Sequence, residues 1–515
     1  MVEYTLRDIL RKTVTDAGAR PDSIALTFDG QHMTFGELDD RSTRLAHGLL
    51  AAGFTKGDKV SVVMYNRLEW VELFFALAKL GGVIVPINYL LAGSEMQYIF
   101  DDSESRWIVV EDTLTPALTP VLDDNAERKI VEVGEPTGLG IAYESLVANP
   151  LDDAPALPDV HADDLFLLQY TSGTTGFPKG AMHTHSTVLW NSYHQIVDFE
   201  VTNDDVYYVV PALCWAAGFH DLALAALWRG GRVVLGRSTG FDPGEFLQQV
   251  EQHGATKVLL VPTVLKRVLN HPEFDRYDTS SLRMVLSGGE PVPPSSLEGL
   301  KAKIPHCDVL QVYGMSEFPT LMLLITGRDA HGRAGSTGKA CSVATIRIID
   351  DAGQDVPAGT IGQIICRSPA NMIGYYNKPE ATASALADGW LHTGDLASYD
   401  DEGFVYMAGR AKDMIITGGL NVYPAEIERV LATHPDVIEA AVVGEPDERW
   451  GEIGIAHVVV RDDAHPAQED VEAYLRERMA GFKVPRVYRF TTQPLPRTTS
   501  GKVQKHRLDK VTHDA

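Results

Sequence analysis

The sequence predicts an α/β protein with largely parallel sheets and more than one domain. Three observations lead to this fold class. The chain has 515 residues, which is too long for one hydrophobic core. Its apolar content of 44% and charged content of 22% are those of a folded globular protein. Runs rich in valine, isoleucine and leucine alternate with amphipathic stretches, as in buried strands joined by helices.

The first elements follow one another closely. Residues 1–18 predict a charged amphipathic helix, which lacks the apolar core of a signal peptide. Residues 59–66 predict a strand, residues 67–82 a helix and residues 83–88 another strand. The most apolar stretch, 70–93, contains charged residues, glycines and a proline, so we expect a buried helix and a strand there and not a membrane span. The β-rich runs that continue the pattern are RWIVVE, DVYYVVP, RVVLG, KVLLVP and RMVLSGG.

The pattern changes after about residue 340. TIRIIDDAGQDVPAGTIGQIICRSP predicts short strands joined by turns, and therefore a β-rich subdomain at about 335–410. From residue 411 onward strands and helices alternate again, which predicts a small α+β domain. The expected boundary lies in GRAKD, so that the N-terminal domain covers 1–410 and the C-terminal domain 411–515.

Charge and cysteine content exclude several functions. A formal net charge of −25 disfavours nucleic acid and anionic membranes as partners, although a local loop can still attract an anion. The four cysteines form no C-x-x-C pair, which suits a reducing cytoplasm and argues against a disulfide scaffold. His183 and His185 lack a third ligand motif, so we do not expect zinc. We expect a cytoplasmic protein that binds small molecules.

The stretch QYTSGTTGFPKGAMHTH, residues 169–185, carries the first functional signal. Its glycines allow backbone N–H groups to approach an anion, and its threonine, serine and lysine side chains supply further donors. The spacing excludes the P-loop of kinases, because Lys179 follows a proline and precedes a glycine. The residues by themselves therefore predict anion binding, and they leave open whether the chemistry is phosphate transfer or simple binding.

This loop resembles the phosphate loop of the adenylate-forming superfamily, which includes acyl-CoA synthetases, peptide-synthetase adenylation domains and luciferases. QVYGMSE (311–317), GWLHTGDLASYDDEGFVYMAGRAKDMIITGGLNVYPAEIE (389–428) and PRTTSGKVQKHRL (496–508) are similar to further motifs of that family, in the same order. GYYNKPEATASAL (374–386) has a similar texture. The resemblance covers essentially the whole chain. It implies an N-terminal domain of two stacked α/β sheet subdomains and the β-rich subdomain, followed by a small mobile C-terminal domain.

The resemblance also implies an AMP-forming acid–CoA ligase. A carboxylic acid would react with ATP to give an acyl-adenylate and pyrophosphate, and the acyl group would then pass to coenzyme A as a thioester. ATP, Mg²⁺ and coenzyme A are thus implied. The alternative acceptor is an amine or a carrier protein, and the retained motif residues disfavour a homologue that binds nucleotide without catalysis. A homodimer is an option that the sequence leaves open.

Three residues are implied to be catalytic. Lys502 would lie between the substrate carboxylate and the α-phosphate, where an ammonium group offsets the repulsion of two anions. Glu317 would bind Mg²⁺, because a hard cation that bridges phosphates takes few protein carboxylates. Lys179 would bind the β- and γ-phosphates. The loop residues implied beside it are Thr171, Ser172, Gly173, Thr174, Thr175 and Gly176, with Thr174 as a second metal ligand.

Other residues are implied at the adenosine end. Tyr313 would stack on the adenine, with Gln311 near its amino edge. Asp395 would accept hydrogen bonds from both ribose hydroxyls, and Arg410 would contact the ribose or a phosphate. Lys412 matches the hinge between the two domains. The remaining positions implied to bind nucleotide are Gly288, Gly289, Glu290, Gly314 and Ser316.

The last two sites are the acyl pocket and the coenzyme A tunnel. Many relatives carry a histidine in P-L-F-H, whereas VVPALCWAAGFHD has Trp215 there, which indicates either an apolar wall for an alkyl or aryl acid or a core tryptophan. Cys214 has no neighbouring base and is not expected to be a nucleophile. The predicted acyl pocket is Trp215, Ala216, Ala217, Gly218, Gly288, Gly314 and Met315. The predicted coenzyme A contacts are Gly418, Gly419, Trp450, Glu452, Phe482, Lys483 and Arg486.

Overall fold

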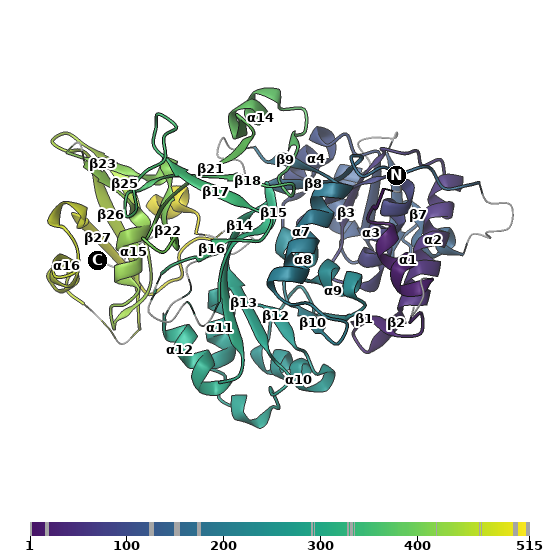
Figure 1. Ribbon diagram of the computed structural model, residues 1–515, viewed down its shortest axis with the longest axis horizontal. Coiled ribbons are helices and arrows are strands. Elements are labelled where there is room, and N and C mark those ends of the chain that lie inside the picture. The colour runs from purple at the N-terminus through teal and green to yellow at the C-terminus, as the bar shows by residue number, and fades with distance from the viewer. Residues whose placement is uncertain are drawn as a thin grey trace.

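The computed structural model describes residues 3–15, 20–122, 128–148, 155–171, 177–289, 292, 294–326, 329, 333, 335–418, 420–462, 464, 466–497 and 503–510. Within these residues the strands form four sheets, of nine, eight, five and five strands (Figure 1). No helix in this part of the chain is both long enough and apolar enough to cross a membrane. The α/β fold class predicted from the sequence is confirmed.

The nine-stranded sheet is mainly parallel and runs in the order β16-β15-β14-β13-β12-β10-β11-β1-β2. Its inner pairs from β1 to β14 are parallel, while β2, β15 and β16 pair antiparallel at the two edges. The strands are β1 (Ile24–Phe28), β2 (Gln31–Thr34), β10 (Val206–Val209), β11 (Arg232–Leu235), β12 (Lys257–Leu259), β13 (Met284–Gly288), β14 (Asp308–Met315), β15 (Phe318–Ile325) and β16 (Lys339–Ala340). Helices α10 (Pro243–His253), α11 (Pro262–Leu269) and α12 (Pro294–Lys303) connect its central strands.

The eight-stranded sheet has the order β19-β9-β8-β4-β3-β5-β6-β7. It is parallel from β8 to β7, and β9 and β19 add an antiparallel edge. Its strands are β3 (Lys59–Val63), β4 (Val83–Pro86), β5 (Trp107–Glu111), β6 (Lys129–Val133), β7 (Ile141–Ala142), β8 (Leu165–Thr171), β9 (Lys179–Thr184) and β19 (Gly374–Tyr375). The β19 segment joins this edge from almost two hundred residues farther along the chain than β9.

One hydrophobic core lies between these two sheets. It includes Leu26 and Leu310 from the nine-stranded sheet, and Val60 and Leu167 from the eight-stranded sheet. Helix α3 (Leu68–Leu80) is buried almost throughout and ends at Gly81 in the left-handed conformation that favours glycine. The predicted buried helix is therefore confirmed. The other helices around this core are α1 (Asp8–Val14), α2 (Phe35–Ala51), α6 (Tyr143–Val147), α7 (His185–Asp198), α8 (Ala216–Phe219) and α9 (Ala223–Arg229).

Helix α1 is shorter than the predicted helix over 1–18. The carboxylate of Asp8 accepts hydrogen bonds from the backbone N–H of Thr5 at 2.9 Å and from its hydroxyl at 3.1 Å. This contact closes a turn before the helix, so the helix begins only at Asp8. Residues 1, 2 and 16–18 of the predicted helix lie outside the described part of the chain.

The third sheet is antiparallel and corresponds to the predicted β-rich stretch. It contains β17 (Thr345–Ile349), β18 (Gly362–Arg367), β20 (Leu386–Ala387), β21 (Trp390–Tyr399) and β22 (Val405–Arg410), and helix α14 (Pro379–Ala385) precedes β20. Helices α4 (Gly93–Asp102) and α5 (Thr115–Leu122) belong to the region of the eight-stranded sheet.

The fourth sheet contains β23 (Ile415–Thr417), β24 (Leu420–Val422), β25 (Val437–Asp447), β26 (Gly451–Val460) and β27 (Val487–Thr491), with helices α15 (Pro424–Leu431) and α16 (Gln468–Arg476). In Figure 1 this yellow-green part lies at one end of the molecule. The third sheet ends at Arg410 and the fourth begins at Ile415. The guanidinium of Arg429 on α15 donates to the carbonyl oxygen of Met407 at 2.8 Å, which joins the two parts. The rotation of the C-terminal part stays a prediction.

Candidate active site

The predicted phosphate loop joins two paired strands. In the β8–β9 hairpin, Thr171 pairs with Lys179 and Tyr170 pairs with Gly180. The antiparallel register therefore places Thr171 and Lys179 at the two ends of the loop. The loop residues that lie outside the described part of the chain are Ser172, Gly173, Thr174, Thr175 and Gly176, and their roles stay predictions.

Glu317 lies at the turn between β14 and β15 and is only 8% exposed. Its Oε1 accepts a hydrogen bond of 2.7 Å from the hydroxyl of Tyr375, and its backbone oxygen accepts one of 2.8 Å from the N–H of Met372. The ammonium nitrogen of Lys179 lies 5.3 Å from the centroid of the Tyr375 ring. The structure thus brings two of the three predicted catalytic residues to one tyrosine.

The Tyr375 phenol is in its protonated form. Burial, together with the neighbouring Glu317 carboxylate, raises the pKa of Tyr375 well above its ordinary value. The hydroxyl therefore keeps its proton at neutral pH and donates it to Glu317. A hydrogen bond to an ionised carboxylate is stronger than one between neutral groups.

His183 supports the same turn from behind. Its Nε2 donates to the carbonyl oxygen of Ser316 at 2.8 Å, and burial lowers the pKa of His183 to about 4. In His185 the Nδ1 accepts a hydrogen bond from the backbone N–H of Leu6, and burial lowers its pKa to about 4 as well. The two histidines are thus neutral and serve packing and hydrogen bonding.

Tyr313, Asp395 and Arg410 form a second group. The hydroxyl of Tyr313 donates to Oδ2 of Asp395 at 2.5 Å, and Nε of Arg410 lies 3.0 Å from Oδ1. Asp395 and Arg410 face each other across β21 and β22, which fixes this ion pair through the sheet register. Asp395 is only 6% exposed, and these partners replace the contacts with water that burial removes. Burial and the Asp395 carboxylate raise the pKa of Tyr313 well above its ordinary value.

The glycines beside Tyr313 differ in their roles. A Cβ on Gly288 would lie 2.4 Å from the carbonyl oxygen of Val312, so the pairing of β13 with β14 requires glycine there. Gly289 has a φ of +84°, and an added Cβ would meet no described atom within 4 Å. Gly289 therefore turns the chain at an open surface. Gln311 and Gly314 lie on β14, and Glu290 lies outside the described residues.

Trp215 is half-buried and immediately precedes α8. It packs against a buried cluster that contains Tyr89 and Cys214, and among the described residues its buried indole N–H has no hydrogen-bond partner. Burial raises the pKa of Cys214 to about 12, so its thiol stays protonated at neutral pH. A Cβ on Gly218 would lie 2.0 Å from the carbonyl oxygen of Ala212, so tight packing explains this glycine. The acyl pocket itself stays a prediction. Its predicted lining residues are Trp215, Ala216, Ala217, Gly218, Gly288, Gly314 and Met315.

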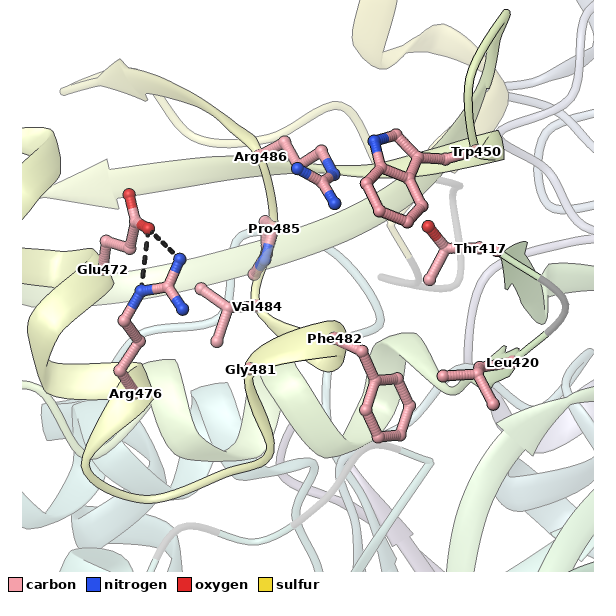
Figure 2. A pocket seen from close by; sticks show the side chains of 11 residues that line it. Thr417, Leu420, Trp450, Glu472, Arg476, Gly481, Phe482, Val484, Pro485 and Arg486 are labelled. Carbon is pink, nitrogen blue, oxygen red and sulfur yellow. Dashed lines mark hydrogen bonds and ion pairs between the residues drawn. The ribbon is translucent and has the colours of Figure 1, made fainter.

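The C-terminal part contains a pocket of about 440 Å³, which Figure 2 shows. Four residues predicted to contact coenzyme A line it, namely Gly418, Trp450, Phe482 and Arg486. The guanidinium carbon of Arg486 lies 4.4 Å from the ring centroid of Trp450. Gly418 has a φ of +57°, and a Cβ there would lie 3.0 Å from the Trp450 ring. Glycine is therefore needed for the backbone to pass beside the indole.

The other predicted contacts of coenzyme A are not among the residues that line this pocket. Lys483 Nζ makes an ion pair of 2.6 Å with Glu426, and Oε2 of Glu452 accepts a hydrogen bond of 2.7 Å from the N–H of Ile416. Both side chains therefore hold neighbouring segments of the C-terminal part together. Lys412 is exposed in a short 3₁₀ helix directly after Arg410. Gly419 and Lys502 lie outside the described residues.

Sequence reasoning missed the segment 370–378. Besides Tyr375, this segment provides Lys378, whose ammonium donates to Asp102 at the end of α4. Asp102 also accepts a hydrogen bond of 2.9 Å from the hydroxyl of Tyr170, just before the phosphate loop. The motif GYYNKPEATASAL could have drawn attention to this segment, but a local sequence motif does not predict which distant residues it contacts.

The site thus contains two groups of polar side chains, one around Glu317 and one around Asp395. Together with a hydroxyl- and glycine-rich loop, such groups can bind a nucleotide and a metal ion. The AMP-binding enzyme family matches residues 14–376, and the AMP-binding enzyme C-terminal domain matches residues 426–502. Since the first match spans well over half of the sequence, the chain belongs to the AMP-binding enzyme family.

Similar proteins agree with this assignment over nearly their full lengths. A feruloyl-CoA synthase from an Amycolatopsis species is 38% identical over 492 residues, which cover 96% of each chain. The anthranilate CoA ligase AuaEII, solved in complex with anthranoyl-AMP, is 28% identical with a TM-score of 0.89, and the match covers 99% of this chain and 97% of the other. The amide bond synthetase McbA from Marinactinospora thermotolerans is 30% identical with a TM-score of 0.89, and covers 98% and 99%.

The predicted family, fold and enzyme class are therefore confirmed. The protein is an adenylate-forming enzyme of the acid–CoA ligase type, and it uses ATP, a carboxylic acid and coenzyme A.

Proposed function

We propose that the enzyme makes coenzyme A thioesters of aromatic carboxylic acids, with the acid beside Trp215. The observation that carries this proposal is the aromatic surroundings of Trp215, which packs on the cluster that contains Tyr89. The rings of Tyr89 and Tyr65 meet edge to face at 4.6 Å. Aromatic side chains favour a ligand ring that can pack against them in the same way. The names of the feruloyl-CoA synthase and the anthranilate ligase, both of aromatic acids, support the choice.

At the phosphate end, Glu317 fits a divalent cation. Its carboxylate offers the oxygen donors that Mg²⁺ prefers, and among the described residues no hydrogen bond is made to Oε2. When bound, Mg²⁺ would neutralise phosphate charge. Lys179 would bind the β- and γ-phosphates with the loop, Thr174 would supply a second metal ligand, and Lys502 would bring the carboxylate and the α-phosphate together.

At the adenosine end, the ring of Tyr313 would stack on the adenine and Asp395 would accept hydrogen bonds from the ribose. Arg410 supports this role, because its ion pair holds the Asp395 carboxylate in one orientation. The pocket beside Trp450 would accept coenzyme A after the C-terminal part rotates about Lys412, with Gly418 and Gly419 beside the pantetheine chain.

A panel of acids tests the acid class. Ferulate, anthranilate and octanoate are each supplied with ATP, and acid-dependent ATP–pyrophosphate exchange is measured. We expect the two aromatic acids to support faster exchange, and Trp215→Leu to raise the KM for the better one without changing the KM for ATP. The matched control is Trp228→Leu, since Trp228 instead stacks on Tyr4 with ring centroids 5.6 Å apart. Preferential exchange with octanoate would refute the aromatic assignment.

The acceptor is tested separately, because the amide bond synthetase McbA shares the fold. The pocket lined by Trp450 and Arg486 supports coenzyme A, and not an amine, as the acceptor of the acyl group. We expect full turnover only when coenzyme A is added, with AMP and a thioester as products. Equal turnover with an added amine and no coenzyme A would instead make the protein an amide synthetase.

Two broader expectations remain part of this proposal. We expect the enzyme to act in the cytoplasm, and a homodimer is the oligomer to test first. Light scattering coupled to size-exclusion chromatography measures the oligomeric state directly. Cell fractionation tests the cytoplasmic location.

A further inference from the structure

We propose that Tyr375 is a positioning residue for the phosphate end of the site, and that it holds Glu317 and Lys179 close together without allowing them to pair. The inference rests on the roles proposed above for these two residues. It starts from the contacts of one side chain, whose hydroxyl donates to Glu317 at 2.7 Å while its ring lies 5.3 Å from the Lys179 ammonium.

The backbone fixes where Tyr375 lies. In the β19–β9 pair, Gly374 is opposite Met182 and Tyr375 is opposite Ala181. The N–H of Ile373 donates to Met182, and the N–H of Tyr376 donates to Gly180, both at 2.9 Å. Because β9 begins at Lys179, this pairing sets the distance between the tyrosine and the lysine.

A local turn locks the same segment. The N–H of Tyr375 donates to the hydroxyl of Thr382 at 2.8 Å, and that hydroxyl donates to the carbonyl oxygen of Lys378 at 2.9 Å. Gly374 has a φ of +143°, and a Cβ there would lie 2.8 Å from Cγ2 of Thr382. The contacts of this one turn thus explain why GYYNKPEAT has glycine at 374, tyrosine at 375 and threonine at 382.

The hydrogen bond restricts the Glu317 side chain. Tyr375 engages Oε1, and the N–H of Met372 in the same segment holds the Glu317 backbone oxygen. With both its backbone and one carboxylate oxygen held, Glu317 presents its other oxygen in one orientation. A cation ligand that is held in this way needs no rearrangement when ATP arrives.

The ring acts on Lys179. A lysine over a tyrosine face is attracted by the ring quadrupole, so its ammonium stays on that side. Among the described residues Lys179 makes no ion pair, and in particular none with Glu317. If the tyrosine were absent, the two opposite charges could neutralise each other and neither would be free for its ligand. Tyr375 thus separates the Glu317 carboxylate from the Lys179 ammonium while keeping both groups in one site.

Direct nucleotide binding tests this proposal. Calorimetry measures the affinity of the full chain for AMP, for ATP without divalent cation and for ATP with Mg²⁺, in the absence of acid. Tyr375→Phe keeps the ring and removes the hydroxyl, and Tyr375→Leu removes both. Tyr376→Phe is the matched control, because its hydroxyl donates to Glu104 instead of Glu317.

For Tyr375→Phe we expect the gain in ATP affinity on adding Mg²⁺ to fall about tenfold, which is the usual effect of losing one hydrogen bond to a charged group. AMP affinity should not change. For Tyr375→Leu we expect a further loss of about threefold in ATP affinity even without Mg²⁺, from the lost ring–ammonium contact. Tyr376→Phe should match the unmodified enzyme in all three measurements.

Two outcomes would overturn the assignment. An unchanged Mg²⁺-dependent gain in Tyr375→Phe would show that the hydroxyl does not position Glu317. An equal loss of AMP and ATP affinity would show that the tyrosine only supports the fold. If the unmodified enzyme itself gained no ATP affinity from Mg²⁺, the proposed role of Glu317 would fail, and this inference with it.

Discussion

The two ends of the reaction are built differently. At the nucleotide end the acidic residues are buried and already bonded, Glu317 to Tyr375 and Asp395 to Tyr313 and Arg410. In the C-terminal pocket two of the apolar lining side chains are open to solvent, Leu420 at 48% and Phe482 at 42% exposed. If these residues bind the ligands proposed above, the charged groups for ATP are oriented before ATP arrives, whereas the apolar surface of the C-terminal pocket stays uncovered until coenzyme A or another part of the enzyme covers it.

The difference has an energetic consequence. Removing one member of a buried polar pair leaves its partner desolvated and unpaired, which costs more than losing an exposed contact. Substitutions at the nucleotide end should therefore be more severe than substitutions in the C-terminal pocket.

The largest effect is expected from Lys502→Ala. If Lys502 offsets the repulsion between the acid and the α-phosphate, the rate of adenylation should fall about 100-fold or more. Transfer to coenzyme A from a supplied acyl-adenylate should change much less. Measuring the two half-reactions separately checks this. An equal loss in both would contradict the proposed role.

Three buried histidines of the N-terminal part should make folding sensitive to acid. Burial lowers the pKa of His183 and of His185 to about 4 and that of His220 to about 3, all below the ordinary value near 6.5. Below pH 6.5 the unfolded chain therefore binds protons that the folded chain does not, so stability is full above pH 6.5 and falls as the pH drops toward 4. At pH 5 each histidine should cost about 2 kcal/mol, about 30-fold in the folding equilibrium.

Urea unfolding at pH 7.5 and pH 5 measures this loss of stability. His220→Asn should reduce the pH dependence by about one histidine's share. His306→Asn is the control, because His306 is exposed. Equal unfolding midpoints at the two pH values would show that these histidines are not kept neutral by the fold.

Asp395→Asn should weaken nucleotide binding at the adenosine end. The amide cannot replace the charge that pairs with Arg410, so we expect AMP and ATP affinity to fall together by about tenfold. This differs from Tyr375→Phe, which should spare AMP. Calorimetry with both nucleotides distinguishes them, and the exposed Asp401→Asn is the control. Unchanged AMP affinity would remove Asp395 from the ribose site.

The smallest effect is expected in the C-terminal pocket. Arg486→Ala removes a guanidinium over Trp450, so the KM for coenzyme A should rise about fivefold while adenylation is unchanged. Arg449→Ala is a close control, since Arg449 lies 4.9 Å from the same ring but does not line the pocket. Loss of adenylation in Arg486→Ala would contradict the separation of the two ends.

Much of the fold could be predicted from the sequence because local patterns determine it. The stretch 59–88 has the strand–helix–strand pattern that β3, α3 and β4 show. For the site, the sequence could predict single residues that belong to a motif, but not the contacts between residues of different motifs. Tyr313 and Asp395 could each be assigned separately, but their hydrogen bond spans 82 positions and depends on how the sheets pack. Tyr375 was missed for the same reason, since its partner Glu317 is 58 positions away.

The edge strand β19 has a consequence for biosynthesis. The phosphate-loop hairpin is complete by residue 184, but the strand that covers its edge begins at Gly374. While the ribosome adds the intervening residues, β9 has unpaired backbone groups that can join a strand from another nascent chain. The open edge of β9 is therefore a place where aggregation during synthesis can begin, until Gly374 and Tyr375 have left the ribosome and paired with it.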